Sequence, residues 1–276
     1  MKNDGEPNDI KNSPLFGFPL SAIYDACLTL IYPQTCRLCE KSVESRADGV
    51  ACRACWQKTR IFARTSKEIL CEKCGAFLES NSSSSGSSSG SDENLKTFCR
   101  RCTDDYFDSA RAVGLYEHAL LATVLNLKKT PFVPLKLQNL FFKAFLQFPF
   151  QHDITRIIPV PLSKHRQSER GFNQASLLAK VLAARANLPL DENSLIRKIH
   201  TPQHRAGMDR KARLKSVRNA FEVTRPKLVE NENILLIDDV FTSGATASNC
   251  AEMLKNKGAR AVYVLTVARA FRRSEQ

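Results

Sequence analysis

Eight of the ten cysteines in this 276-residue chain are arranged in four Cys-x-x-Cys pairs. The pairs are Cys36/Cys39, Cys52/Cys55, Cys71/Cys74 and Cys99/Cys102. A gap of two residues lets both thiolates of a tight turn face one metal ion, so two such pairs complete a tetrahedral Cys₄ site. Pairing between neighbours predicts one site in residues 36–55 and a second in 71–102, and the spacing also permits a crossed arrangement. We therefore expect two structural Zn²⁺ sites.

Other uses of paired cysteines fit this chain less well. Disulfides suit secreted proteins, but the first ten residues are net acidic, unlike the basic start of a signal peptide. Iron–sulfur ferredoxins carry closely spaced runs of cysteines, which are not found here. A redox Cys-x-x-Cys motif would explain one pair and leave three unexplained. The pattern favours zinc as the metal. We also expect the protein to be cytoplasmic.

A second cluster of reactive residue types lies near the C-terminus, in the segment ILLIDDVFTSGATASNC, residues 234–250. Its aliphatic residues predict a buried strand, which runs directly into Asp238 and Asp239. Ligands of parallel α/β sheets bind at the carboxyl ends of the strands. Two carboxylates at such an end indicate a binding site.

The residues after the acid pair predict a phosphate-binding loop. They are Thr242, Ser243, Gly244, Ala245 and Thr246, and a helix follows them. Backbone N–H groups and hydroxyls at the start of a helix bind phosphate, and glycine allows close approach. Carboxylates repel phosphate and suit neutral hydroxyls, with Mg²⁺ nearby to balance charge. A 5-phosphorylated ribose suits both the carboxylate pair and the phosphate-binding loop. A P-loop or an EF-hand would need residues at other spacings.

Alternating strand and helix patterns supply the scaffold for this site. Short aliphatic runs predict strands at 111–116, 154–160, 233–238 and 261–267. Helical periodicity is found near 118–128, 134–148, 174–186 and 246–257. Buried strands separated by helices are typical of a parallel α/β sheet that helices cover on both faces.

The chain divides into three parts by composition. Residues 1–32 form a tail and an amphipathic helix; the apolar stretch 18–32 contains Asp25 and stops before Pro33, so it is too short to cross a membrane. Residues 33–106 hold the cysteines, and residues 107–276 form the α/β domain. Nine serines in the twelve residues 80–91 indicate a flexible insertion in the second cysteine module.

The charge is concentrated in the C-terminal half. The net charge is +13, and residues 151–276 contribute +10 of it, with 22 Lys and Arg against 12 Asp and Glu. Such a surface favours anionic partners, meaning phosphates, nucleotides or nucleic acid.

The segment ILLIDDVFTSGAT resembles the phosphoribosyl-pyrophosphate (PRPP) motif of type I phosphoribosyltransferases. The segments IIPVPLSKHRQSERGFNQASLLA (157–179) and TPQHRAGMDRKARLKSVRNAF (201–221), behind a cysteine module, resemble the ComF/GntX family of competence-associated proteins. The resemblance implies a parallel-sheet phosphoribosyltransferase-like domain preceded by a double zinc ribbon. It implies that Asp238 and Asp239 are catalytic and hold the ribose hydroxyls, and that Thr242–Thr246 hold the 5-phosphate.

Basic residues outside this motif are candidates for binding pyrophosphate. The resemblance implies a pyrophosphate loop after the strand at 154–160, where Lys164, Arg166 and Arg170 follow. Residues 197–218 carry eight Lys and Arg and one acid, and include Arg210, Lys211 and Arg213. We interpret that segment as a loop that closes over pyrophosphate, with a solvated helix face as the alternative.

Two functions follow from these expectations. The first is a Mg²⁺-dependent phosphoribosyltransferase, which we favour. The second is a non-catalytic PRPP sensor that binds single-stranded DNA in natural competence. The resemblance implies single-stranded DNA, a competence helicase and other DNA-uptake proteins as partners.

Overall fold

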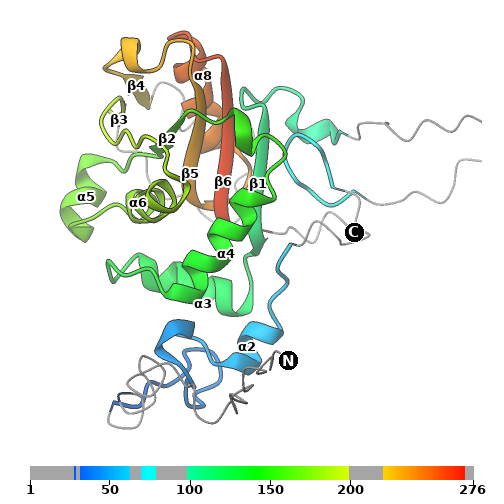
Figure 1. The fold of residues 1–276 in the computed structure, drawn as a ribbon, viewed down its shortest axis with the longest axis vertical. Helices are drawn as coiled ribbons and strands as arrows, with labels where there is room; N and C mark the ends of the chain where they lie inside the picture. Colours follow the sequence, from blue (N-terminus) through cyan, green and yellow to red (C-terminus); the bar gives the residue numbers. More distant parts are fainter. Residues whose placement is uncertain (1–27, 29–31, 63–69, 79–97, 199–219, 271–276) are drawn as a thin grey trace, which may run out of the picture.

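The computed structural model describes residue 28 and residues 32–62, 70–78, 98–198 and 220–270. Figure 1 shows its elements in chain order. They are η1 (Arg46–Asp48), α2 (Arg53–Gln57), η2 (Arg100–Cys102), β1 (Ser109–Leu115), α3 (His118–Leu127), α4 (Leu135–Leu146), η3 (Gln151–Asp153), β2 (Arg156–Pro159), α5 (Lys164–Arg170), α6 (Gln174–Ala186), β3 (Leu195–Arg197), β4 (Phe221–Val223), η4 (Pro226–Leu228), β5 (Asn233–Phe241), α8 (Ala245–Lys255) and β6 (Ala261–Arg269).

Four parallel strands form the main sheet, in the order β1-β6-β5-β2. β2 pairs with β5 only as far as Pro159, which lies opposite Ile237. β5 then continues to Phe241 with β6 as its partner. The acid pair at 238–239 therefore lies just past the end of β2, where β5 keeps β6 as a partner on one side only.

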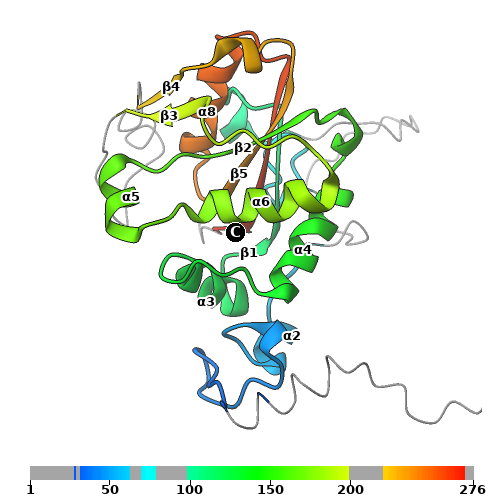
Figure 2. The same cartoon turned by 60° about the vertical axis from the view of Figure 1, so that its left-hand side comes forward.

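Helices cover both faces of this sheet, which explains why its strands are aliphatic on both sides. Leu235 and Ile237 of β5 share a core with buried residues of α3, α4 and α6. Ile234 and Leu236 of the same strand share a second core with α8. The two cores follow the alternation of side chains along a strand. Figure 2 shows α3 and α4 between the sheet and the α2 region.

The two cysteine modules pack against different parts of the α/β domain. The first module, residues 36–55, shares the core of α3 and α4. Figures 1 and 2 show its helix α2 below α3 and α4. The second module, which we define by Cys71–Cys74 and Cys99–Cys102, shares the core of α8. It also attaches to the edge strand β1, because the Ala110 N–H donates to the Lys73 carbonyl over 2.6 Å.

The predicted parallel α/β domain behind a cysteine-rich module is confirmed, with all four expected strands and all four expected helices. The structure adds α5 and the antiparallel pair β3–β4, which the sequence patterns did not predict. The expected N-terminal helix, the serine-rich insertion and most of segment 197–218 lie outside the described residues. Among the helices that the structure describes, none has the length and apolar character to span a membrane.

Candidate functional site

The first cysteine cluster joins the two nearest pairs of the sequence. Its four Sγ atoms, from Cys36, Cys39, Cys52 and Cys55, all lie within 4.8 Å of one another. The closest contacts are 3.6 and 3.7 Å. A tetrahedral zinc site with Zn–S bonds of about 2.3 Å requires sulfur–sulfur distances of about 3.8 Å. The arrangement fits Zn²⁺.

The second cysteine cluster likewise joins neighbouring pairs, so the crossed arrangement is not formed. Its members are Cys71, Cys74, Cys99 and Cys102. Sγ–Sγ contacts measure 3.4–3.5 Å, and the N–H groups of Cys74 and Cys99 donate to the Cys71 sulfur. The hydrogen bond from Cys102 lowers the pKa of Cys71, and the same contact raises the pKa of Cys102. Crowded thiols that stabilise a thiolate suit a divalent cation.

The acid pair lies in the second half of β5. Asp239 is only 8% exposed, whereas Asp238 is partly buried. Burial raises the pKa of Asp238 well above its usual value, and the adjacent charge of Asp239 adds to this effect. The carboxylates are therefore close enough to repel each other, which is the arrangement expected of groups that share one ligand.

Cations from three separate elements surround the acid pair. Lys128, at the end of α3, places Nζ 3.2 Å from Asp239 Oδ2. Gln174, the first residue of α6, donates to the same carboxylate over 3.4 Å, and Arg170 of α5 donates to Gln174 over 3.1 Å. Arg197 of β3 is close enough to Asp238 for their charges to interact. The site therefore presents cationic groups around a carboxylate pair.

The loop that follows β5 leads into the N-terminus of α8. Gly244 is the N-cap of α8 and has φ +79°, a conformation that favours glycine. The Ser248 N–H makes the first intrahelical bond, to the Gly244 carbonyl, over 2.8 Å. N–H groups of the preceding turn have no partner within a helix and carry its positive dipole end. Such a turn offers donors to an anion beside the acids.

The predicted pyrophosphate residues divide into two sets. Lys164, Arg166 and Arg170 lie on the short helix α5 rather than on the expected loop, because Ser163 caps its start and Gly171 ends it in the left-handed conformation. Arg166 interacts with the charge of Asp239, whereas Lys164 is exposed. The other set lies outside the described residues: Arg210, Lys211 and Arg213.

Two residues near the acids were missed by the sequence patterns. Lys128 is one of several lysines at a helix end, and nothing in its spacing distinguishes it. Gln174 begins the predicted helix 174–186, but nothing in its spacing indicates a contact with Asp239. The Asn173 side chain caps this helix and accepts from the Ala175 N–H over 3.0 Å. Arg197 was predicted as part of the basic segment 197–218, and the structure places it on strand β3 rather than in a loop. Only the fold brings these residues to β5.

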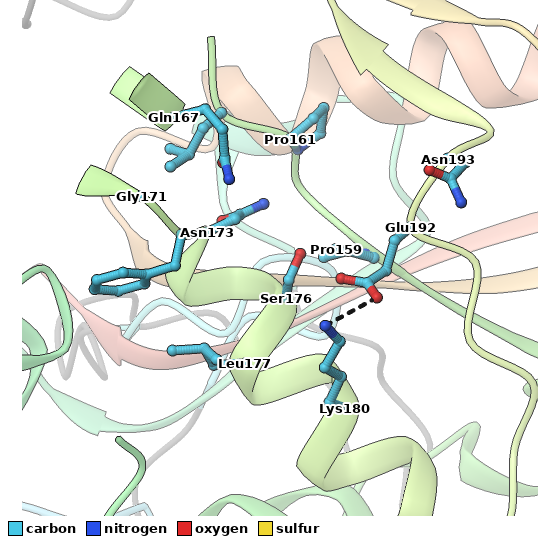
Figure 3. A pocket seen from close by; sticks show the side chains of 12 residues that line it. Pro159, Pro161, Gln167, Gly171, Asn173, Ser176, Leu177, Lys180, Glu192 and Asn193 are labelled. Carbon is cyan, nitrogen blue, oxygen red and sulfur yellow. Dashed lines mark ion pairs between the residues drawn. The ribbon is translucent and has the colours of Figure 1, made fainter. Parts of the chain in front are cut away.

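A cavity of about 480 Å³ opens beside the start of α6, and its lining residues do not include Asp238 or Asp239 (Figure 3). Asn173 and Ser176 contribute amide and hydroxyl groups to its wall. Its charged lining residues, Lys180 and Glu192, form an ion pair with each other over 3.2 Å. The cavity is therefore neutral overall and lacks the cationic character of the acid-pair site.

Comparison with known proteins gives matches of two kinds. A family model described as a double zinc ribbon domain matches residues 27–103. Competence protein F of Haemophilus influenzae is 34% identical over 118 residues, 41% of this chain and 50% of that protein. Competence protein ComFC of Bacillus subtilis is 32% identical over 154 residues, 54% and 55% of the two chains. The chain is therefore similar in sequence to ComF-type competence proteins. It spans about half the length of the curated relatives it matches.

These similarities to ComF-type proteins agree with the resemblance that the motifs indicated. The double zinc ribbon match covers all eight clustered cysteines, so the two Cys₄ clusters are the zinc-binding sites of this module. DNA utilization protein YhgH of Escherichia coli is a further relative, 34% identical over 115 residues, 41% of this chain and 49% of that protein. The division into residues 1–32, 33–106 and 107–276 stays a prediction.

Solved structures similar to this chain include phosphoribosyltransferases. The purine phosphoribosyltransferase of Pyrococcus horikoshii covers 49% of this chain and 82% of its own, at 14% identity and a TM-score of 0.29. The hypoxanthine phosphoribosyltransferase of Staphylococcus aureus covers 50% and 74%, at 11% identity and a TM-score of 0.32. Scores this low carry no argument about activity, which has to be argued from the residues of the site.

Proposed function

We propose that the protein binds PRPP with Mg²⁺ and transfers its phosphoribosyl group, releasing pyrophosphate. The observation that carries this proposal is the juxtaposition on β5 and α8. Asp238 and Asp239 are adjacent near the end of β5, and five residues after Asp239 the chain reaches Gly244, the N-cap of α8. A sugar phosphate needs both kinds of group, with acceptors for hydroxyls and donors for a phosphate.

Each part of the proposed site has a defined task. The carboxylates of Asp238 and Asp239 accept hydrogen bonds from the 2- and 3-hydroxyls of ribose. The loop from Thr242 to Thr246 donates backbone N–H and hydroxyl groups to the 5-phosphate. Mg²⁺, when bound, balances the charge of the pyrophosphate and the acids. Hydrogen bonds from the ribose hydroxyls favour the ionised form of Asp238, whose pKa is raised first by burial and then by the charge of Asp239.

Charge that builds on the leaving pyrophosphate needs cationic groups. Among the described residues, Arg166 and Arg170 of α5 lie on the acid-pair side of the sheet edge and are the candidates for this task. Arg210, Lys211 and Arg213 are candidates from the sequence alone. Lys128 already pairs with Asp239, so we expect it to move or to contact the ligand phosphates on binding.

The process is proposed from the names of the relatives, which are competence and DNA utilization proteins. We infer a role in DNA uptake in the cytoplasm, with single-stranded DNA, a competence helicase or other uptake proteins as partners. A second candidate function is a non-catalytic PRPP sensor that binds single-stranded DNA. The observation that favours it is the net charge of +10 in residues 151–276, since basic surfaces bind nucleic acid.

The test is a calorimetric titration of PRPP with and without Mg²⁺, followed by a pyrophosphate-release assay with candidate acceptor bases. The double variant Asp238→Asn, Asp239→Asn should lose PRPP binding and remain folded. Glu192→Gln, which removes one acid from the separate cavity, is the matched control and should bind like wild type. PRPP binding without pyrophosphate release would favour the sensor, and equal binding by the double variant would refute the site.

A further inference from the structure

Arg269, the last residue of β6, connects the sheet to the second zinc site. Its side chain donates from Nη1 to the Cys74 carbonyl over 2.6 Å, and Nη2 lies 3.9 Å from the Cys74 sulfur. The residue is only 9% exposed. A buried guanidinium requires such acceptors. Cys74 is a predicted zinc ligand, so Arg269 contacts the metal site through both the backbone and the thiolate of one ligand.

The other face of the same guanidinium contacts the end of β5. The Arg269 guanidinium carbon lies 4.9 Å from the centre of the Phe241 ring, which is the distance of a cation–π contact. Phe241 packs edge-to-face on Phe107 with ring centres 5.7 Å apart. Phe107 follows the last zinc ligand, Cys102, by five residues. Phe241 is therefore held between Arg269 and the chain that leaves the second zinc site.

The Phe241 ring in turn contacts the phosphate loop. A Cβ atom placed on Gly244 would lie 2.9 Å from Phe241 Cζ and 3.5 Å from Asp105 Oδ2. The Tyr106 N–H donates to the Ser248 hydroxyl in the first turns of α8 over 3.1 Å. The loop and the start of α8 therefore pack directly on Phe241 and on residues 105–107.

We propose that Arg269 is a positioning residue that makes the conformation of the phosphate loop depend on the second zinc site. Zinc fixes the turn that carries Cys74, and that turn fixes the Arg269 guanidinium. Arg269 holds Phe241, and Phe241 supports Gly244 and the first turn of α8. Without zinc the Cys74 carbonyl and thiol are no longer fixed, so the support of the loop weakens. What the loop binds rests on the proposed function, but this coupling does not.

The first test needs no ligand and measures hydrogen exchange at the Ser248 amide, which donates to the Gly244 carbonyl. Arg269→Met keeps much of the side-chain length but removes the guanidinium. Exchange at Ser248 should accelerate by about tenfold, a typical size for coupling between sites. Arg111→Met is the matched control, because Arg111 donates to the Glu72 carbonyl of the same turn over 2.9 Å but does so from β1 rather than from the end of β6. Unchanged exchange in Arg269→Met with two zinc ions bound would overturn the proposal.

A conservative variant covers the case in which Arg269→Met fails to fold. Arg269→Lys keeps the charge but loses the planar contact with Phe241 and the paired donors. It should also accelerate exchange at Ser248, whereas removal of the first zinc by Cys39→Ser should not. Equal acceleration by Cys39→Ser and Arg269→Lys would show general loosening of the protein and refute a specific link.

The second test measures the binding of PRPP. PRPP affinity with Mg²⁺ should fall by about tenfold in Arg269→Lys and stay close to wild type in Arg111→Met. If wild-type protein does not bind PRPP, the proposed function fails while the exchange result still decides the link. If PRPP binds wild type and Arg269→Lys equally while Ser248 exchange accelerates, the link exists but does not position the phosphate site, and the positioning role is refuted.

Discussion

The two zinc sites have the same four ligands and the same spacing within each Cys-x-x-Cys pair, but they pack against different parts of the protein. The first site lies under α3 and α4, where Trp56 donates to the Asp48 carbonyl and Lys136 of α4 lies 5.1 Å from the Trp56 ring centre. The second site lies beside β1 and shares a core with α8. Its ligand Cys74 contacts Arg269 at the end of β6.

This difference separates two tasks for one kind of metal site. The first site organises a peripheral module that supports α3 and, through it, Lys128 on one side of the acid pair. The second site is built into the wall on which the phosphate loop rests. The two sites therefore differ in the residues that pack against them and not in their zinc ligands. The packing residues of each site can be substituted separately.

The largest expected effect comes from removing one ligand of each site. Cys71→Ser and Cys36→Ser should each leave one zinc ion per chain by elemental analysis. Structural zinc supplies roughly 10–16 kcal/mol of apparent binding free energy, comparable to the stability of a whole domain, about 5–15 kcal/mol. Since the second site shares the core of the sheet and α8, Cys71→Ser should lose cooperative unfolding in calorimetry. Cys36→Ser should lower Tm and keep a cooperative transition. If both variants lost cooperative unfolding to the same extent, the expected difference between the two zinc sites would be wrong.

The next effect tests the contact between Phe241 and the loop. Gly244 and Gly171 have nearly the same positive φ, +79° and +77°, but a Cβ at Gly171 would meet nothing within 4 Å. Gly171→Ala should therefore cost only the backbone conformation, about 1–2 kcal/mol. Gly244→Ala should cost more, because its methyl group collides with Phe241, and it should weaken PRPP binding. Chemical denaturation of the two variants measures the difference, and equal losses would show that the ring moves away freely.

The scaffold and the zinc ligands could be predicted from local patterns. Cys-x-x-Cys spacing, aliphatic strands and the small residues around Gly244 are local signals, because each depends on neighbours along the chain. The four strands, four helices and two Cys₄ clusters followed from them. Helix α5 was not predicted, although Ser163 and Gly171 are good start and stop residues, because its seven residues carry no apolar stripe.

The surroundings of the acid pair could not be predicted, for a physical reason. Lys128 precedes Asp239 by more than 100 residues, and the order of the strands brings the two together. The same holds for Arg269 and Cys74, which contact each other across 195 positions. Such contacts depend on register and helix placement, which no local periodicity encodes.

A third prediction uses two aspartates with opposite pKa shifts. The raised pKa of Asp238 means that its contribution to stability is present below the unfolded pKa, about 3.9, and is lost as pH rises through the folded pKa. Asp238→Asn should therefore be more stable than wild type at neutral pH.

At Asp191 burial opposes the shift, but hydrogen bonds from Ser194 and Asn193 lower the pKa. That contribution is present above about 3.9 and is lost as pH falls, so Asp191→Asn should be less stable at neutral pH. Melting curves from about pH 3, below the usual Asp pKa, to about pH 8 check both signs.

The smallest effect concerns the attachment of the first zinc module to α4. Lys136 Nζ lies 2.7 Å from Asp48 Oδ1 and also faces Trp56, and both charged side chains are mostly covered. Lys136→Ala should cost about 1 kcal/mol, the sum of a partly screened ion pair and a cation–π contact. Lys180→Ala breaks a pair of similar length at 3.2 Å whose lysine is more exposed, and should cost close to zero. Because Lys136 belongs to the first site alone, Ser248 exchange should not change in either variant. Faster exchange in Lys136→Ala would mean that the two modules are coupled, and the separation of their tasks would be wrong.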